Sequence, residues 1–204
     1  MTTVSGLFDN YDDALTAMNK LQALGIDRAS ISIVANSTDD EFARREHAPG
    51  ATAANEVADD AAAGAGLGAV VGGAGGLLAG LGLLTIPGIG PVVAAGWLAS
   101  TGLGAVAGAA AGVAVGGLIG AMTAEGVPER EAHIYAEGVR RGGTLVSARV
   151  EEDQVAEAEA ILKSDSAVDL TERERAYREG GWSRFDPESA AYTADEISRE
   201  RSRQ

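Results

Sequence analysis

Three residues with metal-binding side chains recur at helical spacing in the second half of the chain. Glu129, His133 and Glu137 are each four positions apart, so a helix places all three on one face. Two carboxylates and an imidazole are donors that a divalent metal ion accepts. The same spacing is also common on helices exposed to solvent, which is the leading interpretation here. A metal site formed by these three residues is the alternative.

Other groups of residues suggest chemistry only by composition. Asp9, Asp12 and Asp13 supply carboxylates of the kind that acid–base catalysis uses, but their place before an apolar helical pattern is typical of helix capping. Segments 64–68 and 102–107 loosely match a dinucleotide-binding glycine motif, yet neither follows a predicted strand. A nucleophile, base and orienting group cannot be assembled from the sequence. We therefore expect no enzyme activity, no catalytic residues and no cofactor.

The composition argues against several further classes of protein. The 204 residues carry 30 acidic and 16 basic side chains, a net charge of −14, which repels a phosphate backbone and predicts no nucleic-acid partner. The absence of cysteine excludes disulfides, thiolate zinc sites and iron–sulfur clusters. Because only 4% of residues are aromatic, the core must consist mainly of Ala, Val, Leu and Ile.

An uncharged block, residues 61–124, divides the chain. Within it, glycine recurs every fourth residue in two ladders, which are separated by a turn at 85–91 that contains two prolines. Each glycine weakens a helix by about 1 kcal/mol relative to alanine, so this repeat indicates close contact between two helix backbones. We predict that residues 61–124 form an antiparallel helical hairpin. The predicted helix-packing residues are Gly64, Gly68, Gly72, Gly76, Gly80, Gly104, Gly108, Gly112, Gly116 and Gly120.

The hairpin has two possible environments. Each arm is long enough to cross the ~30 Å apolar core of a bilayer. Basic residues flank the block and none lies in its turn, which predicts a bacterial inner-membrane hairpin with both termini cytoplasmic. Trp97, near the turn, would then lie at the far interface. The many glycines, and Asp59 and Asp60 directly before the block, argue against insertion. The alternative is a cytoplasmic protein whose hairpin forms the core of a homo-oligomer.

The two flanks predict one small α+β body. Its strands are expected at 3–8, 29–34, 144–150 and 167–170, and its helices at 11–24, 128–141 and 152–162. With the insertion and its adjoining helix set aside, this order predicts a ferredoxin-like β-α-β-β-α-β plan. Residues 1–36 would form the first half of the body, 37–60 a linker, and 125–170 the second half.

The remaining residues, 171–204, form a charged tail without hydrophobic periodicity, which predicts disorder. The tail nevertheless holds four of the chain's nine aromatic residues. Aromatic side chains in a solvated tail are typical of segments that dock on a protein partner, although they can also pack back on the body. The candidate docking residues are Tyr177, Trp182, Phe185 and Tyr192.

Both flanks resemble a known family. Residues 4–14 (VSGLFDNYDDA), 24–34 (LGIDRASISIV) and 126–146 (GVPEREAHIYAEGVRRGGTLV) are similar to signatures of the bacterial general stress protein 17M-like, heat-induced family. Some members of that family carry a glycine-rich insertion. The resemblance covers about half of the chain. It implies a stress-associated protein without an established enzymatic activity, and it carries no catalytic residues to this sequence.

Two functions are therefore expected, in order. The first is a stress-associated structural protein, in which the glycine-rich hairpin anchors the chain in a membrane or drives homo-oligomerisation while body and tail recruit partners. The second is a regulatory module that binds a small ligand or a metal through the ferredoxin-like body. That second hypothesis rests on analogy of fold.

Overall fold

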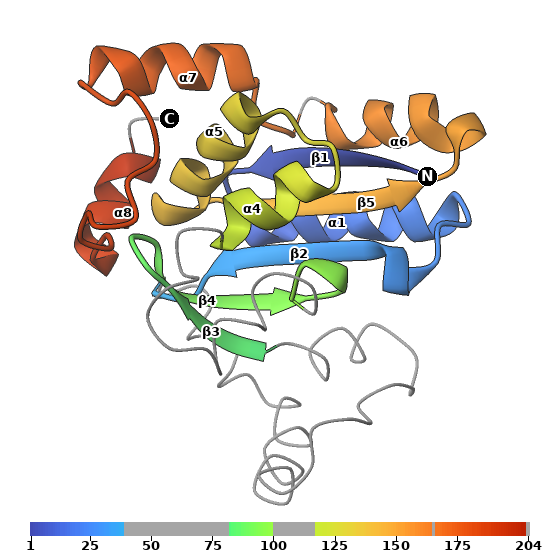
Figure 1. Cartoon of the computed structure of the whole chain (residues 1–204), viewed down its shortest axis with the longest axis horizontal. Coiled ribbons are helices and arrows are strands. Elements are labelled where there is room, and N and C mark those ends of the chain that lie inside the picture. Colours follow the sequence, from blue (N-terminus) through green and yellow to red (C-terminus); the bar gives the residue numbers. More distant parts are fainter. Residues whose placement is uncertain (39–81, 100–116, 165, 203–204) are drawn as a thin grey trace, which may run out of the picture.

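The computed structural model describes residues 1–38, 82–99, 117–164 and 166–202. These residues form a mixed α+β fold around one five-stranded sheet, with the strands in the order β1-β5-β2-β4-β3 and every neighbouring pair antiparallel (Figure 1). The strands are β1 (Thr2–Phe8), β2 (Ile31–Asn36), β3 (Gly82–Ile86), β4 (Gly90–Ala95) and β5 (Thr144–Val150). The helices are α1 (Tyr11–Ala23), α4 (Gly117–Ala124), α5 (Glu129–Arg140), α6 (Val155–Leu162), α7 (Leu170–Glu179) and α8 (Ala194–Arg201), with 3₁₀ turns at Arg28–Ser30 and Glu152–Gln154.

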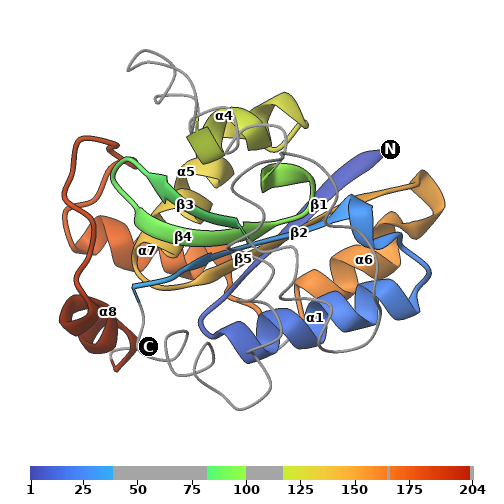
Figure 2. The same ribbon diagram turned by 90° about the horizontal axis from the view of Figure 1, so that it is seen from below.

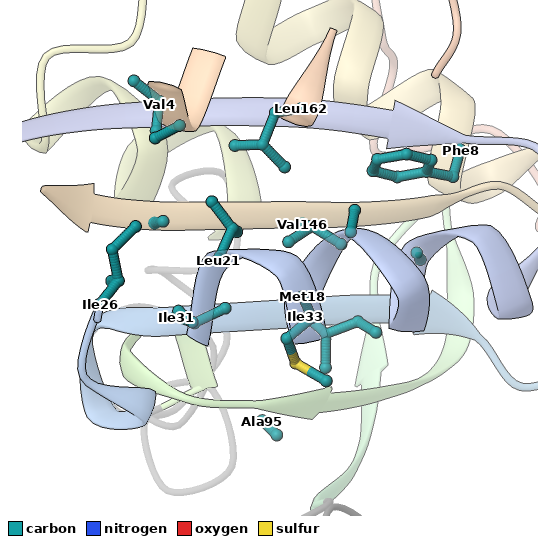
Figure 3. Close-up of a cluster of buried hydrophobic side chains, with 14 of the residues drawn as sticks. Val4, Phe8, Met18, Leu21, Ile26, Ile31, Ile33, Ala95, Val146 and Leu162 are labelled. Carbon is teal, nitrogen blue, oxygen red and sulfur yellow. The ribbon is translucent and has the colours of Figure 1, made fainter. Parts of the chain in front are cut away.

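Helices cover both faces of the sheet. Figure 2 shows α1 and α6 on one face and α4 and α5 on the other. Because side chains alternate along a strand, each strand contributes to two cores. Val4 and Phe8 of β1 belong to the core on the α1 face, whereas Leu7 belongs to the core on the α5 face. In Figure 3, side chains of α1 such as Met18 and Leu21 meet Ile33 and Val146 of the sheet.

The first β-α-β unit forms where the sequence predicts it. The side chain of Asn10 accepts a hydrogen bond from the backbone N–H of Asp13 and begins α1, as the polar residues before the helix indicate. Gly25, at φ +92°, follows the helix and turns the chain toward β2. The helix α5 and the strand β5 also lie within one or two residues of their predicted limits.

The predicted last strand, 167–170, is absent. Within 167–170, Val168 reaches the outer edge of β1, where its backbone N–H donates to the carbonyl of Leu7 at 2.8 Å. The side chain of Asp169 then accepts hydrogen bonds from Thr171 and Glu172 and starts α7, so local capping prevails over a weak strand pattern. The sheet grows instead on the opposite side, through β4 and β3. A complete ferredoxin-like sheet is therefore not what these residues form.

The centre of the glycine-rich block also differs from the prediction. Residues 82–95 form the strands β3 and β4 in place of helical arms, joined by the predicted turn, and β4 pairs with β2. The β-branched residues Ile86, Val92 and Val93 favour strands, and Pro91 lacks the N–H that a helix interior requires. Gly120 lies in α4 with no neighbouring atom within 4 Å of its Cβ position, so it makes no close helix contact in the described part. The other nine ladder glycines, and the predicted linker from residue 39 onward, lie outside the described residues.

The described residues bear on two further expectations, the membrane-spanning hairpin and the disordered tail. Within the described ranges, no helix combines the length and the apolar character that crossing a bilayer requires. The tail is not disordered, because α7 and α8 both pack on the body and bury Tyr177 and Ile197. Sequence periodicity is faint in these short helices, but each has a side-chain cap: Asp169 for α7, and a capping box between Thr193 and Glu196 for α8.

Candidate functional site

The end of α5 carries a group of charged side chains joined by ion pairs. Ala132, Tyr135, Ala136 and Val139 pack on the sheet, so α5 is held along an apolar stripe. The remaining face of the helix presents Glu137, Arg140 and Arg141 toward the C-terminal segment. We call the group formed by these three residues with Tyr177, Tyr192 and Glu200 the Glu137 cluster.

Glu137 is fully buried and bonded to two arginines. Arg141 Nε donates to Glu137 Oε1 at 2.7 Å, and Arg140 Nη1 donates to Oε2 at 3.1 Å. A buried carboxylate without partners would cost several kcal/mol, and these two hydrogen bonds offset that cost. Arg141 Nη1 reaches across to Glu200 Oε1 on α8 at 2.6 Å. Two carboxylates and two guanidinium groups thus balance each other within the cluster.

The electrostatics of Arg141 follow from this arrangement. Burial alone lowers the pKa of an arginine, because it penalises the charged form. Hydrogen bonds to Glu200 and then to Glu137 outweigh burial and raise the pKa of Arg141 above its ordinary value. Arg141 therefore remains a cation throughout the accessible pH range and cannot act as an acid or a base.

Two tyrosines from the C-terminal segment stack on these arginines. The Arg141 guanidinium lies 4.2 Å from the ring centre of Tyr177, and the Arg140 guanidinium lies 4.8 Å from the ring centre of Tyr192. Such contacts contribute about 0.5–2 kcal/mol each, with more when they are desolvated. Burial raises the pKa of Tyr177 to about 12, against the lowering effect of nearby Arg173. Tyr177 therefore stays neutral at physiological pH.

Two further ion pairs attach α7 to the body. Arg173 donates two parallel hydrogen bonds to the carboxylate of Asp9, both at 2.8 Å. Glu174 accepts from Arg130 of α5 and, at 2.8 Å, from Arg178. These hydrogen bonds, chiefly that from Arg130, lower the pKa of Glu174. Asp9 is thus engaged in a structural ion pair, in addition to standing before α1.

Beyond α7, the chain crosses to the turn between β3 and β4. A Cβ atom at Gly88 would lie 2.8 Å from the carbonyl oxygen of Asp186 and 3.1 Å from Cζ of Phe185. Phe185 is 6% exposed and belongs to the same apolar core as Ile86 and Ile89. The contact between the turn and the C-terminal segment is therefore direct, and it is close enough to require glycine at position 88.

The predicted metal ligands do not come together. Both oxygens of Glu137 bond to arginines, and Glu129 is 79% exposed and 3.8 Å from Nε2 of His133. Elsewhere in the described ranges, too, the structure assembles no group of three His, Cys, Asp or Glu side chains suited to a metal ion. Glu137, at one end of this helix face, bonds to the two arginines, whereas Glu129, at the other end, is exposed to solvent.

The predicted docking aromatics pack on the protein itself. Tyr177 and Phe185 are buried, Trp182 stacks edge-on against Tyr177 with ring centres 5.7 Å apart, and Tyr192 lies under Arg140. This packing matches the alternative that the sequence left open, in which the aromatic side chains pack back on the body. None of the four is presented to a partner as a free aromatic tail.

Sequence reasoning missed the importance of the two arginines. Arg140 and Arg141 complement the dipole of α5, which their position predicts, but they also close the Glu137 cluster. The signal was present in the spacing, because Glu137 precedes them by three and four residues.

Trp97 was also misplaced by sequence reasoning. It is 4% exposed, in the core on the α5 face, and Arg149 stacks on it at 4.1 Å while bonding to Glu125. Trp97 therefore anchors the end of β4 to the body, whereas the sequence placed it at a membrane interface.

The described site is built to hold parts of the chain together. Its charges are paired, Tyr177 is neutral, and Arg141 stays a cation. Segments 64–68 and 102–107, with their loose dinucleotide motif, lie outside the described residues. Comparison with family models, with curated proteins and with solved structures found no match.

Proposed function

We propose that this protein is a non-enzymatic, stress-associated assembly protein of bacteria. In this proposal the α+β body carries a glycine-rich insertion that associates with copies of itself or attaches to a membrane. The stress association comes from the resemblance of both flanks to the general stress protein 17M-like family. The assembly role comes from the two glycine ladders and from the way in which the body holds the segment between them.

One observation carries the assembly role. In the hairpin of β3 and β4, Gly82 pairs with Ala94, so the start of β3 lies beside the end of β4. The first ladder ends at Gly80, just before β3, and the second begins at Gly104, shortly after Trp97. The end of β3 that follows the first ladder in the sequence and the end of β4 that precedes the second therefore lie side by side. This arrangement supports antiparallel pairing of the ladders, with a β-hairpin in place of a simple turn between them.

The body in this proposal is a variant of the ferredoxin-like plan. The strand β5 lies between β1 and β2 and is antiparallel to both, as in a split β-α-β unit. Two described residues contact the edge beyond β1, where a fourth strand would pair: the backbone N–H of Val168 donates to the carbonyl of Leu7, and the hydroxyl of Tyr135 donates to the carbonyl of Ser5. The glycine-rich block supplies the additional strands at the other edge.

The test combines cell fractionation with a pair of ladder variants. We expect the wild-type chain either in a membrane pellet that withstands an alkaline wash or as one large species in size-exclusion chromatography. Gly72→Leu with Gly112→Leu should abolish that state, because leucine would separate the paired backbones. Gly50→Leu, outside both ladders, is the control. A monomer in the wild type, or silent ladder substitutions, would contradict the proposal.

A second candidate function rests on a hollow between α5 and α7. The hollow has a volume of about 430 Å³ and is open to solvent. Three arginines and two glutamates line it together with one threonine: Arg130, Arg175, Arg178, Glu174, Glu179 and Thr171. Guanidinium groups held in place by Glu174 suit a small anionic ligand. Calorimetric titration with inorganic pyrophosphate tests this, with Arg175→Ala expected to remove any heat of binding.

A further inference from the structure

We infer that the C-terminal strap, residues 180–202, clamps the hairpin of β3 and β4 to the body and controls its detachment. Figures 1 and 2 both show the part of the strap that connects α7 to α8 passing the turn between β3 and β4. The strap touches the insertion at one point and the end of α5 at another. The strap is therefore placed to couple the hairpin of β3 and β4 to the end of α5.

The first attachment of the strap is at the turn of the hairpin. Phe185 lies against Gly88 and shares a core with Ile86 and Ile89. A Cβ atom at Gly90 would lie 2.8 Å from Cβ of Ala191, so a second strap residue also touches the turn. The backbone of the hairpin turn is thus held on one side by chain from the far end of the sequence.

The second attachment is at the turn between α5 and β5. Ile197 of α8 is fully buried and packs directly on Gly142, where a Cβ atom would overlap its Cγ2. Arg201 donates to the carbonyl of Gly142 at 2.8 Å, and Glu200 bonds to Arg141. None of these contacts involves the hairpin, so the distal end of the strap can be loosened without altering the hairpin itself.

The hairpin depends on such a clamp because its attachment to the sheet is short. The pairing of β4 with β2 covers four residue pairs, whereas the pairing of β1 with β5 covers seven. Short edge elements open locally more readily than central strands. Detachment of the hairpin would expose the buried side chains of Ile86, Ile89 and Val92. Exposed apolar surface promotes association, so release of the strap should favour assembly, a consequence that rests on the proposed function.

The experiment measures hydrogen exchange across the full-length protein. Ile197→Ala loosens the strap at its distal end, and Phe185→Ala removes its contact at the hairpin. In both variants, exchange of the amides in 82–95 should accelerate by about tenfold, with a much smaller change in β1 and β5. Ile161→Ala, which truncates a partly buried residue of α6 on the opposite face, is the matched control for lost apolar contact.

The decisive result is the effect of Ile197→Ala on the hairpin, because Ile197 packs on Gly142 at the other attachment of the strap. Acceleration confined to residues 180–202 would overturn the clamp. Acceleration in 82–95 with a shift from the wild-type species to a larger one on size-exclusion chromatography supports both the clamp and the proposed function. If exchange accelerates in 82–95 but Gly72→Leu with Gly112→Leu has no effect on assembly, the clamp is supported and the assembly role is contradicted.

Discussion

Arg141 and Glu200 lie 59 positions apart in the sequence, yet Arg141 Nη1 donates to Glu200 Oε1 at 2.6 Å and both side chains are 16% exposed. The same guanidinium bonds to buried Glu137 through Nε. A single arginine thus joins the end of α5 to the last helix of the chain. The predictions below follow from such contacts.

Replacing Glu137 with glutamine should leave Arg140 and Arg141 without their shared counter-charge in a mostly buried setting. We expect Glu137→Gln to lower the free energy of unfolding by about 3 kcal/mol. Chemical denaturation at neutral pH measures the change. The control is Glu159→Gln on α6, whose pair with Lys163 is solvent-exposed and should contribute less than about 0.5 kcal/mol. Equal effects of the two substitutions would contradict the structural importance of the Glu137 cluster.

Gly96 should be intolerant of any side chain. Its φ of +84° lies in the left-handed region, and a Cβ atom there would overlap the carbonyl oxygen of Ile31. Gly25 provides the matched comparison, since its φ is +92° but nothing lies within 4 Å of its Cβ position. Gly25→Ala should cost about 1–2 kcal/mol from backbone strain alone. Thermal unfolding should show a clearly larger loss for Gly96→Ala, and equal losses would mean that the approach to Ile31 is looser than described.

Stability should fall in the alkaline range because of Tyr177. Burial raises its pKa to about 12 in the folded protein, from an ordinary value of 10. The unfolded chain therefore loses the phenolic proton first, so the stabilisation is complete below pH 10 and declines as the pH rises toward 12. Urea unfolding between pH 9 and pH 11 should show a slope, up to about 1.4 kcal/mol per pH unit for one proton. Tyr177→Phe should reduce that slope, and an unchanged slope would assign it to other groups.

Removing Arg149 should loosen Trp97. The guanidinium stacks on the indole at 4.1 Å and is held there by Glu125. We expect Arg149→Ala to lower stability by about 1–2 kcal/mol and to shift the emission of Trp97 to longer wavelength as water reaches the ring. The measurement uses a Trp182→Phe background so that one tryptophan reports. Arg175→Ala, an exposed arginine on α7, should leave the emission unchanged.

The sequence predicted the parts of the fold whose signals are local. The helix expected at 11–24 and the strand expected at 144–150 agree with α1 and β5 to within one residue. The hairpin of β3 and β4 was missed because the glycine repeat around it suggested one continuous helical block. Val92 and Val93 indicate a strand, but they stand in a stretch of only four residues between Pro91 and Gly96 inside that block.

The candidate site was harder to predict, since it depends on contacts between distant segments. Local composition indicated that four aromatic residues of the tail would be buried, either on a partner or on the body: Tyr177, Trp182, Phe185 and Tyr192. Which surface would bury them depends on α7 and α8. Those helices are short and polar, and caps and ion pairs hold them to the body with only a few buried apolar residues.

The position of β5 has a consequence for synthesis of the chain on the ribosome. The strands β1 and β2 flank β5 and do not pair with each other, so the N-terminal unit has no completed sheet until β5 emerges. More than 100 residues separate the end of β2 from the start of β5. At about 5–20 residues per second, that gap lasts several seconds, during which β1 lacks the strand that it pairs with in the sheet. The nascent chain is therefore a natural client for chaperones that shield hydrophobic segments before folding can finish.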